Sequence, residues 1–265
     1  MNSRINPIVF QITNVLAVII ALVLNSLVNI IALFGVTTGQ VSDAYPSLFT
    51  PANYVFSIWG VIYVTAVIFA IYQARGSQRD AAYLPEVNFL YLAGSLLNVA
   101  WLVIWHYSYS QPLFLIYTVL LMVLLLVSLL AIYHRLGIGV KDLTRNQRLA
   151  VNLHISLYLG WICLATIANL ASTLNVFVPG IPIDVQVLWT VLVIVVVIVL
   201  TLLMLYLRRD IVFSIVVIWA AIGIAYKQLA IPLITGAALA TILITVIAII
   251  VIPLIQKTSI RNYYL

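Results

Sequence analysis

The chain has 265 residues, of which 65% are hydrophobic and only 7% are charged. Soluble domains carry about 25% charged residues, so this composition excludes a soluble globular protein and indicates an integral membrane protein with little mass outside the bilayer. The net charge of +6 comes from basic residues that stand singly or in pairs between apolar runs. Nucleic-acid binding needs a clustered basic face, and we therefore expect no nucleic-acid partner.

Eight apolar segments follow one another along the chain. A helix needs about 20 mainly apolar residues to cross a bilayer core of about 30 Å. The segments are 8–35, 52–74, 86–107, 112–134, 148–172, 185–207, 211–226 and 232–256. They predict an all-α polytopic membrane protein with eight transmembrane helices, of which the seventh is the shortest.

Local signals mark where several of these helices begin. Pro51, Pro112 and Pro232 stand at segment starts, and proline in a first helical turn leaves no hydrogen bond unmade. Asp184 and Asp210 stand where an N-cap or a first-turn acid is favourable. We therefore expect the second span to begin at Pro51 and the seventh directly after Asp210.

The basic residues give the orientation. If the N-terminus is cytoplasmic, Lys227 alone lies in an outer loop. The inner segments hold the other eleven, which are Arg4, Arg75, Arg79, Arg135, Lys141, Arg145, Arg148, Arg208, Arg209, Lys257 and Arg261. Cytoplasmic loops carry the excess of Lys and Arg. We therefore expect a multi-pass protein of the bacterial plasma membrane with both termini cytoplasmic.

Three spans carry an aromatic and polar face at helical spacing. The faces are Phe56, Trp59, Gly60 and Tyr63 on span two; Tyr91, Ser95, Asn98, Trp101 and Trp105 on span three; and His154, Tyr158, Trp161, Ala165, Ala168 and Ser172 on span five, with Asn169 beside them. An interfacial belt accounts for Trp105 near a span end but not for the deeper Trp101 and Trp161. Asn98 and Asn169 fit either interhelical hydrogen bonding or a pocket wall. Three such faces on neighbouring spans favour a shared ligand cavity.

Catalytic and metal-binding patterns are not found in the sequence. No His, Cys or carboxylate spacing matches a metal site. No carboxylate lies deep in a span, which argues against an ion-coupled pump. We expect no catalytic residue, no metal and no required cofactor.

Three motifs in order resemble the tryptophan-rich sensory protein family, TspO/MBR, which includes the mitochondrial translocator protein. They are "PSLFTPANYVFSIWGVIY" at 46–63, "LLNVAWLVIW" at 96–105 and "LYLGWICLATIAN" at 157–169. Thr50-Pro51 or Pro51-Ala52 stands where the family has Pro-Pro, Asn53 or Tyr54 where it has the following Trp, and Leu157 where it has proline. The resemblance covers about residues 8–172 and implies five spans. It predicts a TspO-like five-helix membrane domain over 1–175 and three additional transmembrane helices over 176–265, as in a long-form member.

The resemblance implies a pocket for porphyrins, sterols or aromatic drug-like ligands beneath the loop between spans one and two. Together with the helical faces, it predicts ten ligand-binding residues, which are Phe56, Trp59, Tyr63, Asn98, Trp101, Tyr158, Trp161, Ala165, Thr166 and Asn169. The loop 41–54 would act as a lid that includes Pro46, Thr50, Pro51, Asn53 and Tyr54.

Four functions remain open at this stage. The first is a binding or sensor-type protein whose partners are membrane lipids and a tetrapyrrole, sterol or similar lipophilic ligand. The second is a transporter of such a substrate, and the third is a porphyrin-modifying enzyme. The fourth is a structural or assembly role for the last three helices. A homodimer is also left open.

Overall fold

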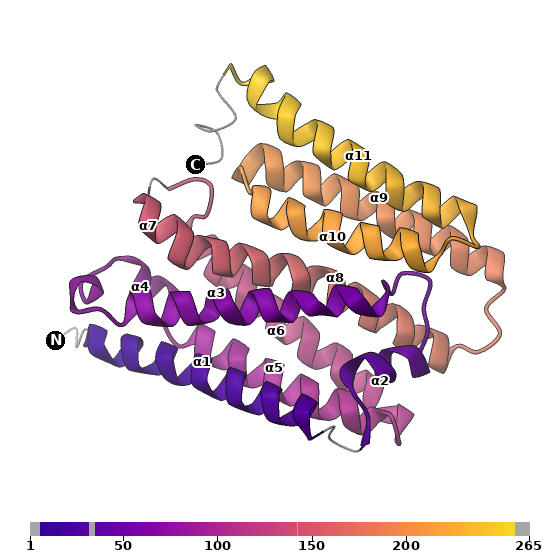
Figure 1. Ribbon diagram of the computed structural model, residues 1–265, viewed down its shortest axis with the longest axis horizontal. Helices are drawn as coiled ribbons and strands as arrows, with labels where there is room; N and C mark the ends of the chain where they lie inside the picture. The colour runs from indigo at the N-terminus through magenta and orange to yellow at the C-terminus, as the bar shows by residue number, and fades with distance from the viewer. Residues whose placement is uncertain (1–5, 32–34, 142, 258–265) are drawn as a thin grey trace.

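The computed structural model describes residues 6–31, 35–141 and 143–257, and every regular element in that part of the chain is helical (Figure 1). The long helices are α1 (Pro7–Ile30), α3 (Ile58–Gln73), α5 (Leu90–Ser108), α6 (Leu115–Leu136), α8 (Leu153–Phe177), α9 (Ile183–Arg208), α10 (Ile211–Lys227) and α11 (Pro232–Ile255). Shorter helices connect them, which are α2 (Thr38–Ala44), α4 (Tyr83–Val87), α7 (Arg145–Gln147), three 3-10 turns at Asn53–Ser57, Gly76–Gln78 and Pro112–Phe114, and a π-helical turn at Arg148–Asn152.

The helices form two groups that meet along α8 and α10. In the first group α5 packs on α1 and α6, α6 packs on α8, and α3 lies against α1 and α8. In the second group α9, α10 and α11 pack on one another, and α10 also packs on α8 (Figure 1). The five predicted spans of the TspO-like bundle therefore pack together, and the last three helices contact them through α10.

Seven of the described helices are long and apolar enough to cross a membrane. The prediction of a polytopic, all-helical membrane protein is therefore confirmed. The eighth, α10, has 17 residues, which is about 25 Å at 1.5 Å per residue. Its residues are mostly buried between helices. By contrast, α9 exposes large apolar side chains that suit contact with lipid, among them Leu192, Val196 and Leu200.

Several helix starts agree with the local sequence signals. Asn6 Oδ1 accepts a hydrogen bond from Ile8 N at 3.0 Å at the start of α1. Asp210 is the N-cap of α10, and its Oδ1 accepts from Phe213 N at 3.0 Å. Asp184 lies in the first turn of α9, and Pro232 begins α11. These starts need only neighbouring residues, because a cap satisfies the free N–H groups of the first turn.

The predicted segment 52–74 agrees with the apolar helical stretch Asn53–Gln73, but the expectation that Pro51 begins the helix is wrong. Residues 51–52 are extended, and the α-helix begins only at Ile58, after the 3-10 turn Asn53–Ser57. The reason is a tertiary contact: Ala52 N donates to Gly223 O of α10 at 3.2 Å, so the backbone there pairs with another helix. The start of span three also moves, since Asn88, with φ of 37°, separates α4 from α5.

Basic residues gather at one end of the helix bundle. Figure 1 shows the start of α1, the end of α11, α4 and α7 at this end, and α2 at the other. The links that meet there hold Arg75, Arg79, Arg135, Lys141, Arg145, Arg148, Arg208 and Arg209, and Lys257 follows α11. Arg4 and Arg261 lie outside the described residues. Lys227 ends α10 at the opposite end.

Gly139 allows the link after α6 to touch the end of α9. Its φ is +76°, and a Cβ built there would overlap the carbonyl oxygen of Arg208. Gly180 has a similar φ of +83°, but a Cβ there would meet nothing within 4 Å.

We therefore expect Gly139→Ala to destabilise the protein by about 3 kcal/mol or more, since it adds a backbone clash to the cost of a left-handed residue. Gly180→Ala should lose only the conformational part, about 1–2 kcal/mol. Thermal unfolding of both variants in detergent measures the difference. Equal losses would contradict the packing of this link on α9.

Candidate functional site

A cavity lies between α3, α5, α8 and α10, under the segment 45–57 that leads into α3. Its cavity volume is about 40 Å³. The site is therefore narrow as it stands. It is lined by Thr38, Ser42, Phe49, Thr50, Pro51, Phe56, Trp59, Trp101, Trp105, Trp161, Leu164, Ala165, Ala168, Asn169, Ser172, Ala220 and Ile224.

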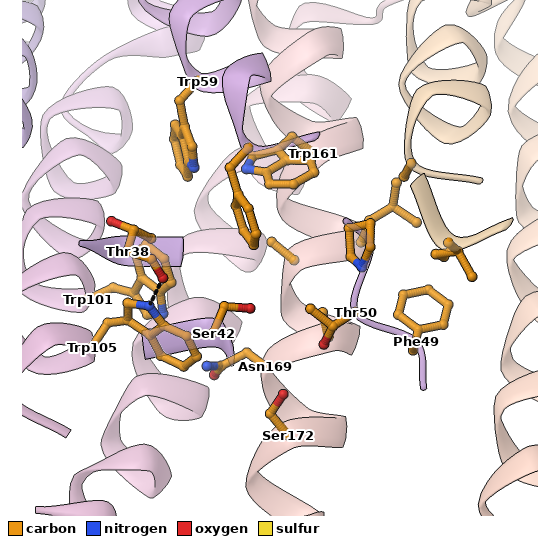
Figure 2. Close-up of a pocket in the computed structure, with 17 residues that line it drawn as sticks. Thr38, Ser42, Phe49, Thr50, Trp59, Trp101, Trp105, Trp161, Asn169 and Ser172 are labelled. Carbon is orange, nitrogen blue, oxygen red and sulfur yellow. Dashed lines mark hydrogen bonds between the residues drawn. The ribbon is translucent and has the colours of Figure 1, made fainter. Parts of the chain in front are cut away.

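Indole rings from three helices form the walls (Figure 2). The ring of Trp59 stacks on that of Trp101 with centroids 6.4 Å apart, and meets Trp161 edge-on at 6.2 Å. Trp101 stacks in turn on Trp105 at 5.7 Å, and Phe56 meets Trp161 edge-on at 5.8 Å. Such offset and edge-on pairs are favourable aromatic geometries. The cavity therefore offers flat apolar surfaces at fixed angles.

Three hydrogen-bond donors on these walls have no partner. The indole Nε1 atoms of Trp101 and Trp161 and the amide Nδ2 of Asn169 are buried and unbonded. Trp105 differs, because its Nε1 donates to Thr38 O at 3.2 Å (Figure 2). Leaving a buried donor without an acceptor costs about 1–3 kcal/mol. Acceptor groups on a molecule in the cavity would remove that cost.

Small hydroxyl groups surround Asn169 at the end of the cavity away from Trp59. Figure 2 shows Ser42, Asn169 and Ser172 together there. Asn169 is held in place because its Oδ1 accepts from Thr118 Oγ1 at 3.1 Å. These polar side chains lie beside Trp101 and Trp105 (Figure 2), so the cavity combines aromatic walls with a small polar group that orients a ligand.

The segment 45–57, here called the lid, covers the cavity and lies on α10. Besides the Ala52–Gly223 backbone bond, Trp219 Nε1 of α10 donates to Val55 O at 3.1 Å. A Cβ at Gly223 would overlap Val55 and lie 3.0 Å from Pro51 Cβ. Only glycine allows the lid to come this close to α10.

Polar contacts hold the lid and α2 at their edges. Lys227 of α10 lies 3.8 Å from Asp43 in an ion pair, and its Nζ donates to Pro51 O at 3.5 Å. Tyr45 OH donates to Ser108 O at the end of α5. Burial raises the pKa of the Tyr45 phenol, and the nearby Tyr109 adds to the rise. Tyr45 therefore remains a neutral donor at physiological pH.

A buried histidine network lies further along the same aromatic face. Thr65 Oγ1 donates its one proton to Ile62 O at 2.9 Å, so His154 Nδ1, 3.0 Å from that oxygen, carries a proton and donates it. His154 Nε2 then accepts from Tyr91 OH at 2.7 Å. Both ring nitrogens are satisfied in the neutral form. This network ties α3, α5 and α8 together and does not line the cavity.

Six of the ten predicted ligand-binding residues line this cavity, which are Phe56, Trp59, Trp101, Trp161, Ala165 and Asn169. Of the other four, Tyr63 lines an adjoining cavity of about 300 Å³ with Phe56 and Trp59, and all four contact protein. Tyr63 and Tyr158 pack on the Trp59 ring at 5.9 and 6.1 Å. Asn98 Oδ1 accepts from Asn25 at 3.1 Å, and Thr166 donates to Ile162 O at 2.7 Å.

Some of the predicted lid residues line the cavity, and the others contact neighbouring parts of the protein. Thr50 and Pro51 line the cavity. Asn53 donates to Asp43 at 2.6 Å, and Pro46 O accepts from Asn175 at 3.0 Å. The ring of Tyr54 packs on Trp219 and Tyr226 of α10. These three residues hold the lid rather than face the cavity.

Nine residues that line the cavity were not predicted as site residues. They are Thr38, Ser42, Phe49, Trp105, Leu164, Ala168, Ser172, Ala220 and Ile224. Helical spacing had already placed three of them on the predicted faces, Trp105 with Trp101 and both Ala168 and Ser172 with Trp161, although they were not chosen as ligand-binding residues. Ala220 and Ile224 carry no sequence signal, because they are ordinary residues of an apolar helix.

Sequence comparison connects this architecture to known proteins. The profile of TSPO-like proteins matches residues 11–251. The chain belongs to this family. The matched region includes α9, α10 and most of α11, so it extends beyond the motifs that end at residue 169. No curated protein and no solved structure matches the chain.

The close approach at Gly223 gives a test of lid docking. We expect Gly223→Ala to push the lid away from α10, because the new methyl group would overlap Val55. Hydrogen–deuterium exchange of residues 45–57 should then become faster. Gly60→Ala is the matched control, since a Cβ there meets nothing within 4 Å and alanine favours a helix by up to about 1 kcal/mol. Unchanged protection of the lid in Gly223→Ala would contradict this contact.

Proposed function

We propose that this protein binds a flat, lipophilic, acceptor-bearing ligand within the membrane, as a binding or sensor-type protein, and that the ligand is a tetrapyrrole. The observation that carries the proposal is the group of three unpartnered buried donors, Trp101 Nε1, Trp161 Nε1 and Asn169 Nδ2, on the walls of one aromatic cavity.

The chemistry of the walls favours some lipophilic ligands over others. A tetrapyrrole presents a flat ring system that stacks on indoles, and its carboxylate or carbonyl groups supply several acceptors. A sterol is less suited, because its ring system is not flat and its single hydroxyl satisfies few donors. A charge-balancing basic residue does not line the cavity, so the ligand should enter with its charged groups at the polar end or neutralised.

A tetrapyrrole is larger than the space now reachable in the cavity, so its binding requires the lid to move. The lid is held to α10 by three hydrogen bonds, which are Ala52 N to Gly223 O, Trp219 Nε1 to Val55 O and Lys227 Nζ to Pro51 O. A partly exposed ion pair between Lys227 and Asp43 also holds α2 to α10. The proposed role of α10 is therefore to hold a lid that a ligand displaces.

We also propose that all eight long helices cross the membrane, with both termini in the bacterial cytoplasm. Two facts support this topology: α10 runs beside α9 and α11 (Figure 1), and the described basic residues other than Lys227 lie at or beside links at one end of the bundle. An excess of Lys and Arg is the usual mark of cytoplasmic loops.

Tryptophan substitution tests the ligand site. In wild type, protoporphyrin IX should quench tryptophan fluorescence saturably. Trp101→Phe keeps a stacking ring but removes the N–H, and should weaken binding about tenfold, the size of one lost hydrogen bond to a charged or strong acceptor. Trp101→Leu removes the ring as well and should weaken binding further.

Trp189→Phe is the control for the lost fluorophore, because Trp189 on α9 is 64% exposed and does not line the cavity. Its titration curve should match wild type after scaling. If the dissociation constant of protoporphyrin IX in Trp101→Leu is the same as in wild type and in the control, this site does not bind the porphyrin.

Single-cysteine labelling tests the topology. Cys163 is the one cysteine of the chain, so the variants are made in a Cys163→Ser background. Cysteine at Leu229, between α10 and α11, and at Ser110, between α5 and α6, should react with an impermeant maleimide added outside. Cysteine at Val140, between α6 and α7, should react only after the membrane is opened. If the cysteines at positions 229 and 140 are both protected from the external maleimide, α10 does not cross the membrane.

A further inference from the structure

A separate cavity, of about 290 Å³, lies at the end of the bundle where α2 meets the link between α8 and α9 (Figure 1). Residues 44–46, at the end of α2 and the start of the lid, form one side of it, and residues between Asn175 and Gln186 form the other. At about 30 Å³ per molecule in the liquid, this is the space of about ten waters, which is enough for one six-membered sugar ring. We call it the polar cavity.

Two side-chain amides of the polar cavity keep open hydrogen-bonding positions. Asn175 Nδ2 donates to Pro46 O at 3.0 Å, and Gln186 Nε2 donates to Ile181 O at 2.9 Å. These bonds fix the direction of each amide. Within the described part of the chain no donor bonds to Asn175 Oδ1 or Gln186 Oε1, and each amide also keeps a second N–H. Each amide therefore offers an acceptor and a donor to a molecule in the cavity.

Hydroxyl groups match this pair of functions, because a hydroxyl both donates and accepts. None of the described residues that line the polar cavity is charged, so an ionic group would lose its hydration there without a partner. The other lining side chains include Pro46, Val176, Val178 and Ile181, which are apolar. A sugar ring carries hydroxyls on its rim and C–H groups on its faces, so it matches both kinds of wall.

The polar cavity is open to water on one side and closed by protein on the other. Pro46, Val178 and Gly180 at its walls are exposed. The Tyr45 ring is only 8% exposed, and its OH donates to Ser108 O of α5, so Tyr45 lines the cavity from the protein side. A ligand can therefore enter from the water or the lipid headgroups at this end of the bundle.

We propose that the polar cavity binds one neutral sugar ring, supplied as a free glycoside or as the head of a glycolipid in the adjacent leaflet. The site is distinct from the aromatic cavity, since none of the described residues lines both. The inference does not depend on the tetrapyrrole proposed above.

The test measures hydrogen–deuterium exchange of residues 175–186 in the full-length protein, in nanodiscs prepared without sugar detergents. The soluble probes are methyl β-glucoside and methyl β-galactoside, and the lipid probes are glucosyl- and galactosyl-diacylglycerol. At least one of the four should slow exchange saturably. Protection by a free glycoside identifies a soluble sugar as sufficient, and protection by a glycolipid alone identifies a lipid head. The same diacylglycerol without a sugar is the control and should give no protection.

A pair of variants at Gln186 separates ligand binding from loop structure. Gln186→Met and Gln186→Glu both lose the hydrogen bond to Ile181 O, but only Gln186→Glu keeps an acceptor. Gln186→Met should weaken binding of the sugar about fivefold, the size of one neutral hydrogen bond. Gln186→Glu should bind at least as tightly as wild type, because a carboxylate is a stronger acceptor and an acid near the start of α9 is favourable.

A filled cavity gives a second test, which decides the matter if Gln186→Met does not fold. Ala44 is exposed and lines the polar cavity, so Ala44→Phe should abolish the protection. Ala82→Phe places the same ring at an exposed position at the other end of the bundle and should leave it unchanged.

Three results would overturn the sugar site. The first is the absence of saturable protection by all four probes. The second is equal protection by the diacylglycerol without a sugar, which would assign the effect to the lipid tails. The third is wild-type affinity in Ala44→Phe, or equal affinities in Gln186→Met and Gln186→Glu.

Discussion

The core of a lipid bilayer offers no hydrogen-bond partners, so polar groups inside this protein must find them within the chain. Most of them do. Gln11 and Gln73 exchange side-chain and backbone hydrogen bonds between α1 and α3, and His154 is satisfied at both nitrogens. Unpaired groups occur elsewhere too, as in Asn14. What distinguishes the donors of Trp101 and Trp161 is that they lie on the walls of one cavity.

The same constraint explains how much the sequence could predict. A spanning helix must be apolar over about 20 residues, and this length is visible without a structure. Helix starts at Pro232 and Asp210 need only adjacent residues and were predicted correctly. Pro51 was not, because Ala52 pairs with Gly223, which lies far along the chain and gives no local signal.

The residues of the candidate site were also predicted only where a local sequence pattern marks them. Helical spacing placed Trp59, Trp101 and Trp161 each on the aromatic face of its own helix, and the family motifs predicted that the three faces share one pocket. It could not distinguish a residue that faces space from one that faces a partner. Asn98 lies on the same face as Trp101, yet Asn25 bonds to it. The contribution of α10 was invisible, because alanine and isoleucine in an apolar helix look the same whether they touch lipid, protein or a cavity.

The contacts that hold the lid closed and the unpaired donors beneath it act in opposite directions, which ties access to binding. Three hydrogen bonds to lid backbone or from it hold the lid to α10, and each is worth about 0.5–1.5 kcal/mol net. The Lys227–Asp43 pair adds little, because Asp43 is half exposed and exposed ion pairs contribute about 0–1 kcal/mol. Opening must also uncover Phe49 and Val55, which are buried in the closed lid, and acceptors on a ligand offset part of that cost by satisfying the buried donors. A ligand without acceptors would lack that offset, so the closed lid selects against purely hydrocarbon molecules from the surrounding membrane.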